Sequence, residues 1–136
     1  MPQPKNTYRI QFHQHFNFAD FASIISYLQQ LGIHTIYASP ILAATPGSTH
    51  GYDGISSHRI NPEIGIKKQL IQLKKQLRQY NMLWLQDIVP NHMAYHPDNA
   101  WLMDVLELGK NCAYHSYFDT AYSTELMSGK IMVPIL

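Results

Sequence analysis

Strand-like and helix-like segments alternate along residues 7–88 of the chain. The strand-like segments are residues 7–12, in which apolar and polar side chains alternate, residues 33–38, which are rich in β-branched and aromatic side chains, and residues 82–88, which begin with an apolar run. A helical pattern separates each from the next, with tight turns before the strands and long loops after them. Strands joined through a helix run parallel, and right-handed crossovers bring their C-terminal ends to one edge of the sheet. The order βαβαβ therefore predicts an α/β fold whose polar loops gather at the C-terminal edge of a parallel sheet.

The two helices are predicted from apolar spacing and from the residues at their ends. The first runs from Phe18 to Leu31, since Asn17 can cap its first turn, Asp20 can reach back, and Gly32 suits the position after its last turn. Asn81 can end the second helix in the left-handed conformation. The apolar face of that helix is formed by Ile66, Leu70, Leu73, Leu77 and Tyr80. Its lysines lie largely outside this face, which favours a solvated surface over an anionic partner site.

Polar side chains follow the second and third predicted strands. Residues 41–62 have several glycines and prolines and no sustained period, which predicts a long loop at the C-terminal edge. Within it, residues 48–53 are too rich in specific side chains to be mere spacer. The third strand leads into Asp87-Ile88-Val89-Pro90-Asn91-His92, where Pro90 forbids helical continuation. These two stretches are the candidate functional site, although turn and cap roles would also explain such residues.

Beyond residue 92 the pattern loosens. Asn99 can cap a helix that ends at Gly109, with an apolar face of Leu102, Val105 and Leu106. Residues 113–119 are aromatic without a clean period. Residues 130–136 are strand-like and apolar up to the last residue, which suggests a sequence cut from something longer.

Composition excludes several classes of protein. A chain of 136 residues that is 46% apolar with a net charge of +1 is neither disordered nor built to bind nucleic acid. One cysteine excludes an internal disulfide, the first residues lack a secretory signal, and no apolar run approaches the ~18 residues of a membrane span. We therefore expect a cytoplasmic location, with neither nucleic acid nor membrane as a partner.

Eight histidines raise the question of a metal site. His92 and His96 are four residues apart, but Pro90 and Pro97 beside them disfavour a helical pair of ligands. Because spacing places no third ligand, no metal site is predicted.

Seven motifs lie along nearly the whole chain, at residues 7–11, 39–42, 46–53, 59–63, 87–93, 104–107 and 129–130. Together they resemble the α-amylase family of (β/α)8-barrel enzymes and, within it, the N-terminal part of the maltooligosyl trehalose synthases. The chain departs from the family pattern at Gly54-Ile55-Ser56-Ser57-His58. The resemblance implies a TIM barrel, of which residues 1–95 are the first three βα units and residues 96–136 the truncated start of the insertion after the third strand. A complete barrel needs ~250 residues.

The resemblance also implies an activity. Such an enzyme, a (1→4)-α-D-glucan 1-α-D-glucosylmutase, converts the terminal α-1,4 bond of a maltooligosaccharide into an α,α-1,1 bond by intramolecular transglucosylation, without a cofactor. The family's catalytic carboxylates follow later strands, so this chain is expected to contain no catalytic residue and to be inactive by itself. A hydrolysing or debranching relative, or a non-catalytic relic, are the alternatives.

The family's binding roles apply to the loops at the C-terminal edge. Tyr52 corresponds to the aromatic platform on which the glucose at the cleaved bond stacks. Asp53 corresponds to an acceptor for hydroxyl groups of that glucose, and His92 to a ligand of its hydroxymethyl oxygen. The remaining roles implied are a further sugar contact for His50, orientation of neighbouring groups for Asp87, and support of the loop for Asn91.

Three strands of an eight-stranded barrel leave two open edges and an uncovered sheet face. We therefore expect the fragment to self-associate. The residues expected to lose cover are Tyr8, Ile10, Phe12, Ile36, Tyr37, Leu83, Leu85 and Ile88.

Overall fold

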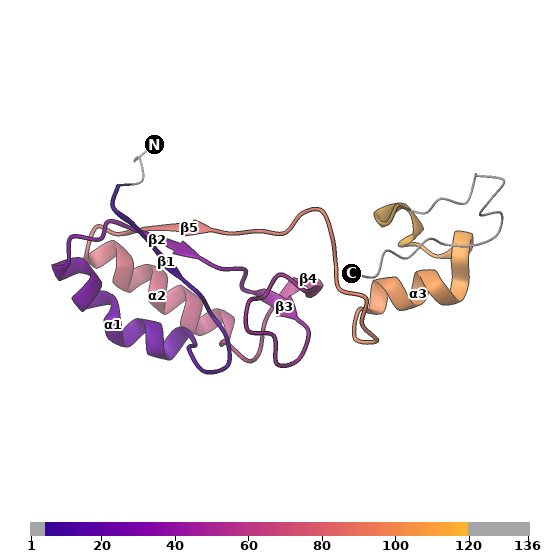
Figure 1. Ribbon diagram of the computed structural model, residues 1–136, viewed down its shortest axis with the longest axis horizontal. Helices are drawn as coiled ribbons and strands as arrows, with labels where there is room; N and C mark the ends of the chain where they lie inside the picture. Colours follow the sequence, from indigo (N-terminus) through magenta and orange to yellow (C-terminus); the bar gives the residue numbers. More distant parts are fainter. Residues whose placement is uncertain (1–4, 120–136) are drawn as a thin grey trace. The chain divides into compact units, whose positions relative to one another are not determined.

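The computed structural model describes residues 5–119. The chain forms two compact units, residues 1–94 and residues 95–136. The first unit contains a parallel sheet in the order β1–β2–β5, formed by β1 (Thr7–Ile10), β2 (Thr35–Ala38) and β5 (Leu83–Gln86). Helices α1 (Phe18–Gln30) and α2 (Lys67–Gln79) lie side by side against one face of this sheet (Figure 1). The predicted βαβαβ order and parallel pairing are confirmed.

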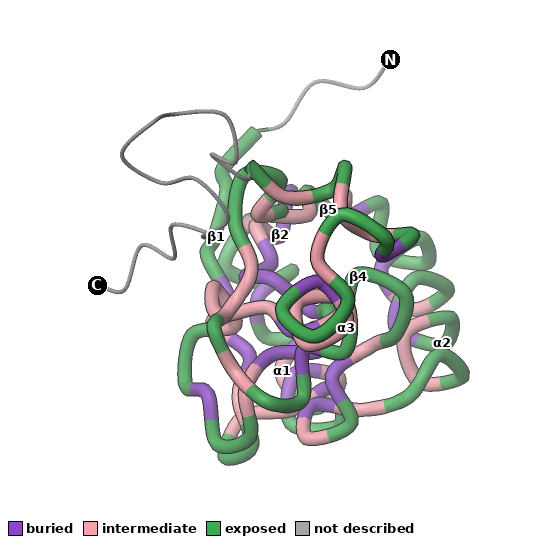
Figure 2. Tube along the Cα trace, turned by 90° about the vertical axis from the view of Figure 1, so that its right-hand side faces the viewer, coloured by how far each residue is buried: buried purple, intermediate pink, exposed green. Residues whose placement is uncertain are grey.

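The core of the first unit lies between the sheet and the two helices, where Figure 2 shows the buried stretches of chain. Phe12 packs edge-on against Phe21 of α1, with ring centroids 5.7 Å apart, and stacks on Trp84 of β5 at 6.0 Å. Ile10, Phe12 and Ile36 are all buried in this core. The expectation that these three residues are exposed to solvent is therefore wrong, because they face the helices rather than the open side of the sheet.

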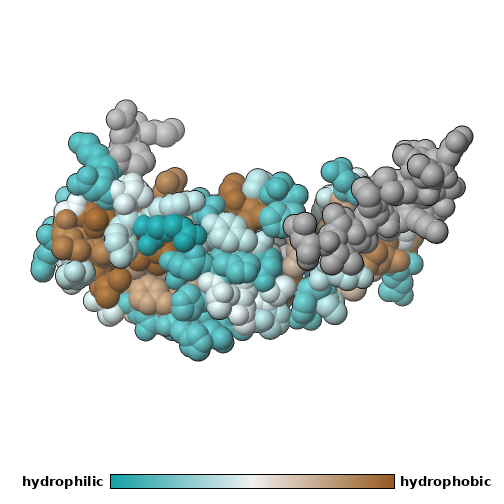
Figure 3. All heavy atoms as spheres, in the orientation of Figure 1, coloured by the Kyte–Doolittle hydropathy of each residue, from teal (hydrophilic) through white to brown (hydrophobic). Residues whose placement is uncertain are grey.

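Other apolar residues of the sheet are exposed, as expected. Tyr8 and Leu85 are each 46% exposed and Ile88 is 65% exposed, whereas Tyr37 and Leu83 are half-buried. Figure 3 shows hydrophobic side chains at the surface of this unit among hydrophilic ones. β1 and β5 are the outer strands of the sheet in the described part of the chain.

The residues at the ends of the helices have the predicted geometry. The Asn17 side chain accepts hydrogen bonds from the N–H groups of Ala19 and Asp20, while the Asp20 carboxylate accepts from the N–H of Asn17 at 2.9 Å. Gly32 and Asn81 adopt φ angles of +78° and +54°. These bonds satisfy donors that have no partner within the helix, and the positive φ angles turn the chain into the next strand.

The apolar face of α2 is narrower than predicted. Leu73 and Leu77 are buried, but Ile66 is 58% exposed and Tyr80 is 37% exposed. Both lie at the ends of the helix, where Ile66 is the N-cap and Tyr80 the C-cap residue. They therefore extend beyond the region that packs on α1 and the sheet.

The long loop predicted for residues 41–62 contains two strands, so that expectation is wrong in part. β3 (Leu42–Ala44) and β4 (Gly54–Ile60) pair antiparallel, with irregular register on both sides of Ala43. A three-residue strand with a broken register presents no alternating pattern to read. The turn between the two strands, residues 45–53, contains the first candidate stretch.

The second unit is described from Tyr95 to Asp119. It contains α3 (Ala100–Leu108) and two 3-10 turns, η1 (Gly109–Asn111) and η2 (His115–Tyr117). Asn99 caps α3 as predicted, by accepting a hydrogen bond from the N–H of Leu102 at 3.3 Å. Of the predicted apolar face, Val105 is buried, while Leu102 is half-buried and Leu106 exposed. The strand predicted at 130–136 lies outside the described residues.

Within residues 5–119, no helix has the length and apolar character needed to cross a membrane.

Candidate functional site

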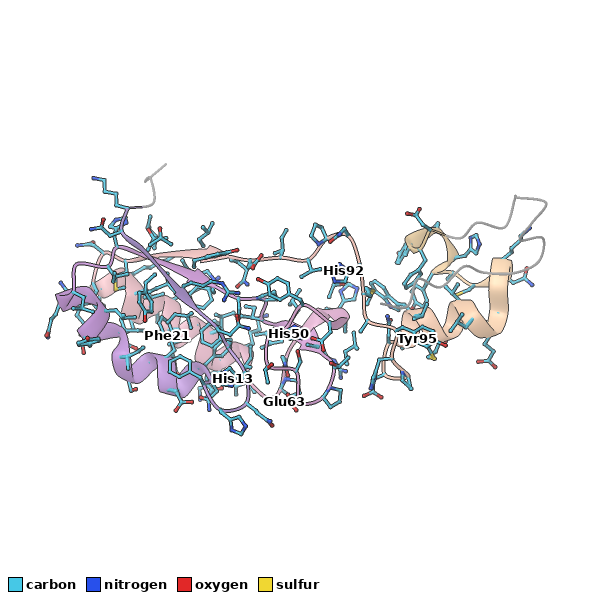
Figure 4. All side chains as sticks on the ribbon, viewed as in Figure 1. His13, Phe21, His50, Glu63, His92 and Tyr95 are labelled. Atoms are coloured by element: carbon cyan, nitrogen blue, oxygen red, sulfur yellow. The ribbon has the colours of Figure 1, made fainter. Side chains whose placement is uncertain are left out.

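The ends of the parallel strands and the β3–β4 turn bring the predicted site residues together. The N–H of Asp87 donates to the carbonyl of Ala38 at 2.9 Å, which extends the β2–β5 ladder by one residue. Asp87 is thereby fixed at the C-terminal edge of the sheet. His50 and His92 lie at this end of the unit, near the β3–β4 hairpin (Figure 4).

Asp87 is the centre of a hydrogen-bond network. Its Oδ2 accepts from the hydroxyl of Tyr37 at 3.0 Å and also from the hydroxyl of Tyr52. The guanidinium of Arg9 donates through Nη2 to the hydroxyl oxygen of Tyr52 at 3.0 Å, and its Cζ lies 5.7 Å from the ring centroid of Tyr37. The hydrogen bond to Asp87 raises the pKa of Tyr37, and loss of water contact and the charge of Asp87 act in the same direction. Each of these effects favours the neutral phenol.

Arg9 and Tyr37 are site residues that sequence reasoning missed. Strand register places Arg9 opposite Tyr37, and Tyr37 opposite Leu85, on the sheet face away from the helices. Alternation in Tyr8-Arg9-Ile10 is a signal that could have found Arg9, because a strand residue between two apolar ones points to the other face.

Tyr52 is held at its backbone as well as at its hydroxyl. The His92 Nε2 lies 3.0 Å from the carbonyl oxygen of Tyr52, so this ring nitrogen must bear the hydrogen. On the other side, the rings of His50 and Tyr52 stack with centroids 6.0 Å apart, and the N–H of Tyr52 donates to His50 Nδ1 at 3.0 Å. The structure therefore brings Tyr52, His50, His92 and Asp87 together, while their roles in sugar binding stay predictions.

Gly51 lets the turn pass close to the sheet. Its φ angle is +76°, and a Cβ at this position would lie 2.8 Å from the carbonyl oxygen of Pro40. Only glycine combines this φ angle with so close a contact. The turn therefore packs closely against Pro40, the second residue after β2.

The carboxylate of Asp53 is hydrogen-bonded within its own loop. Its two carboxylate oxygens accept hydrogen bonds from the hydroxyls of Ser48 and Thr45, and His50 Nδ1 lies 3.6 Å from Oδ1. Partial burial acts to raise the pKa of Asp53, but the bonds from Ser48 and Thr45, helped by its backbone and by His50, hold the pKa below its ordinary value. This geometry is that of a turn-stabilising carboxylate. Sugar binding by Asp53 stays a prediction.

A cavity of about 190 Å³ opens beside Asp87 and His92, between the β3–β4 hairpin and the loop after β5. Its apolar lining includes Ile41, Leu42, Ile88, Val89 and Met93. Asn91 contacts the neighbouring ring, with Oδ1 at 3.3 Å from His92 Nδ1. From residue 5 to residue 119, no group of three or more His, Cys, Asp or Glu side chains is placed to hold a metal ion.

A parallel sheet that carries aromatic, acidic and imidazole side chains at its C-terminal edge is the arrangement found in β/α-barrel enzymes, whose sites lie at that edge. The family model described as the catalytic domain of alpha amylase matches residues 17–131. The chain belongs to the α-amylase family.

Relatives within this family are similar over most of the chain. A provisionally named maltooligosyl trehalose synthase of Mycobacterium tuberculosis is 40% identical over 96% of this chain and 18% of its own length. The structure of the maltooligosyltrehalose synthase from Arthrobacter ramosus is 37% identical with a TM-score of 0.84, over 88% of this chain and 16% of that one. The structure of the type III pullulan hydrolase from Thermococcus kodakarensis is 26% identical with a TM-score of 0.69, over 88% of this chain and 22% of that one.

These comparisons confirm the resemblance and the predicted fold class, the N-terminal βαβαβ part of a TIM barrel. The chain spans less than a fifth of the length of the synthases that it matches.

Proposed function

We propose that this chain supplies the first three βα units of the catalytic barrel of an enzyme that converts the terminal α-1,4 bond of a maltooligosaccharide into an α,α-1,1 bond. In this proposal residues 96–136 begin the insertion after the third barrel strand. The similarity to maltooligosyl trehalose synthases supports the reaction. The cytoplasmic location stays a prediction from the sequence.

The observation that carries the proposal is the position of Tyr52. Its hydroxyl is bonded to both Asp87 and Arg9 at the C-terminal edge of the sheet, and its carbonyl oxygen lies 3.0 Å from His92 Nε2. A tyrosine held at both ends offers a fixed apolar ring, and an apolar ring suits the C–H face of a glucose unit. We place the glucose at the cleaved bond on this ring.

Around that glucose, each polar group of the site has a different role. His92 binds a sugar hydroxyl through its ring, His50 makes a further contact from the same turn, and Asp53 accepts from a sugar hydroxyl in addition to its own loop. Asp87 orients Tyr52, and Asn91 supports His92. Transfer itself needs two carboxylates about 5 Å apart, a role that we assign to none of these residues.

A hydrolysing member of the α-amylase family would use the same edge of the sheet. Residues 87–92 are expected in both kinds of enzyme, whereas Gly47-Ser48-Thr49-His50 resembles the trehalose-forming branch alone. This stretch favours the transglucosylation over hydrolysis.

Maltopentaose titrated into the chain, followed by two-dimensional NMR, tests the sugar site. We expect weak binding, with a Kd of about 1 mM, because association costs several kcal/mol and this chain supplies only part of the contacts. Resonances of residues 50–53 and His92 should shift.

Tyr52→Ala should abolish those shifts, while Tyr27→Ala should not. Tyr27 is a matched control because it lies on α1 and is 58% exposed. Micromolar binding that is unchanged in Tyr52→Ala would contradict the placement of the sugar.

A further inference from the structure

Arg9 has an unusual partner for an arginine. Its Nη2 donates at 3.0 Å to a neutral phenol, the hydroxyl of Tyr52, and its guanidinium lies over the ring of Tyr37. Arginine usually pairs with a carboxylate or phosphate, whose geometry its planar fork matches. Within residues 5–119 Arg9 has no ion pair with a carboxylate. Within the described residues, the contacts of the guanidinium are therefore with the two tyrosines.

Arg9 fixes the direction of the hydrogen bonds at Tyr52. A guanidinium can only donate, so the hydroxyl oxygen of Tyr52 accepts from Arg9 and its one proton is left for Asp87. Tyr37 donates to the same carboxylate oxygen at 3.0 Å. The four side chains thus form one chain of bonds, Arg9 to Tyr52 to Asp87, with Tyr37 as the second donor.

This network joins elements that are distant in the sequence. Arg9 comes from β1, Tyr37 from β2 and Asp87 from the end of β5, whereas Tyr52 lies in the β3–β4 turn. A side chain on a turn is less precisely placed than one on a strand, and contacts to rigid elements remove that freedom.

We propose that Arg9 and Tyr37 are positioning residues of the sugar site, which hold the Tyr52 ring in its stacking orientation through the Tyr52 hydroxyl and the Asp87 carboxylate. The sugar part of this inference rests on the proposed function of Tyr52. Neither residue has to touch the sugar, since both act through Tyr52.

The test uses the 136-residue chain with ¹³Cζ-labelled tyrosine, because this carbon reports the hydrogen bonding of the phenol oxygen. Tyr52→Phe assigns the Tyr52 resonance. In Arg9→Gln and in Tyr37→Phe the Tyr52 resonance should move, and the Kd for maltopentaose should rise about three- to tenfold. Arg9→Lys keeps the charge and one donor, so the Tyr52 resonance and the Kd for maltopentaose should both lie closer to those of the unchanged chain.

Matched controls lie on the same strand and on the neighbouring hairpin. Tyr8→Phe removes a phenol hydroxyl from β1, and Arg59→Gln removes an exposed guanidinium from β4. Neither should move the Tyr52 resonance or the Kd. A merely structural role of Arg9 would lower the melting temperature of the chain but leave the Tyr52 resonance of the folded state in place.

The two readouts separate the two proposals. An unchanged Tyr52 resonance in folded Arg9→Gln, Arg9→Lys and Tyr37→Phe overturns the positioning role. A shifted resonance supports that role even if the unmodified chain binds no maltopentaose, an outcome that would overturn the sugar site itself.

Discussion

At the scale of single residues, one carboxylate favours the neutral form of a neighbouring phenol, that of Tyr37. Asp87 Oδ2 accepts hydrogen bonds from two phenols, those of Tyr37 and Tyr52. A phenol that donates to a carboxylate is stabilised in its neutral form, since its ionised form would place two negative charges side by side. The hydrogen bond from Tyr37 to Asp87 is therefore present only while Tyr37 keeps its proton.

This coupling predicts a pH dependence for Tyr37. The pKa of Tyr37 is raised in the folded chain, first by the bond to Asp87. A raised pKa contributes stability that is fully present below the unfolded value of about 10 and is lost as pH rises through the folded value. Asp87→Asn should therefore lower the pKa of Tyr37 toward its ordinary value.

A ¹³Cζ titration of Tyr37 between pH 8 and 12 measures this effect, with Asp104→Asn as the control. If Tyr37 titrates at the same pH with and without the Asp87 charge, the network does not exist in solution.

At the scale of elements, the β3–β4 turn depends on one glycine. Gly51 and Gly32 have nearly the same φ angles, +76° and +78°, but only at Gly51 would a Cβ meet the backbone of Pro40. Gly32→Ala therefore measures the cost of the φ angle alone, about 1–2 kcal/mol. Gly51→Ala adds the clash, for a total of about 2–4 kcal/mol, and should also displace Tyr52.

Urea unfolding of the two variants gives both free energies. Equal losses in the two variants would mean that the turn does not pack on Pro40.

Elements with local signals could be predicted from the sequence. Asn17 and Asp20 form the expected cap, and Gly32 and Asn81 adopt the expected left-handed conformation, because these features depend on neighbours in the chain. The β3–β4 hairpin was missed, since its pairing joins residues far apart and its register is irregular. Asp87, Tyr52 and His92 could be predicted as candidates from the polar loops that contain them, and their roles from the family motifs.

Arg9 and Tyr37 were missed for a different reason. Their roles depend on the register of β1 with β2 and on a turn that returns to the sheet. Neither residue lies in a loop of polar side chains, the pattern that indicates candidate residues after the second and third strands. A search for charged residues between apolar ones in each strand would have selected Arg9.

At the scale of the whole molecule, two outer strands and an open sheet face predict self-association. Leu85 lies on that face and is 46% exposed. Leu85→Lys should shift the chain toward monomer, because a charge on an edge strand opposes pairing. Leu31→Lys is the control, since Leu31 is 56% exposed but follows α1.

Size-exclusion chromatography with light scattering compares the three proteins at several concentrations. A monodisperse monomer of the unchanged chain at high concentration would show that its sheet needs no partner.

The central claim is that this chain forms the start of an α-glucan-active barrel with Tyr52 as the sugar platform. A chimaera in which residues 7–94 replace the matching segment of the Arthrobacter ramosus synthase measures this most directly, through the formation of maltooligosyl trehalose. We expect an active chimaera in which Tyr52→Ala lowers kcat about 10- to 100-fold, as for the loss of ~1.5–3 kcal/mol at the transition state. A folded, active chimaera whose turnover is unchanged by Tyr52→Ala would contradict the claim.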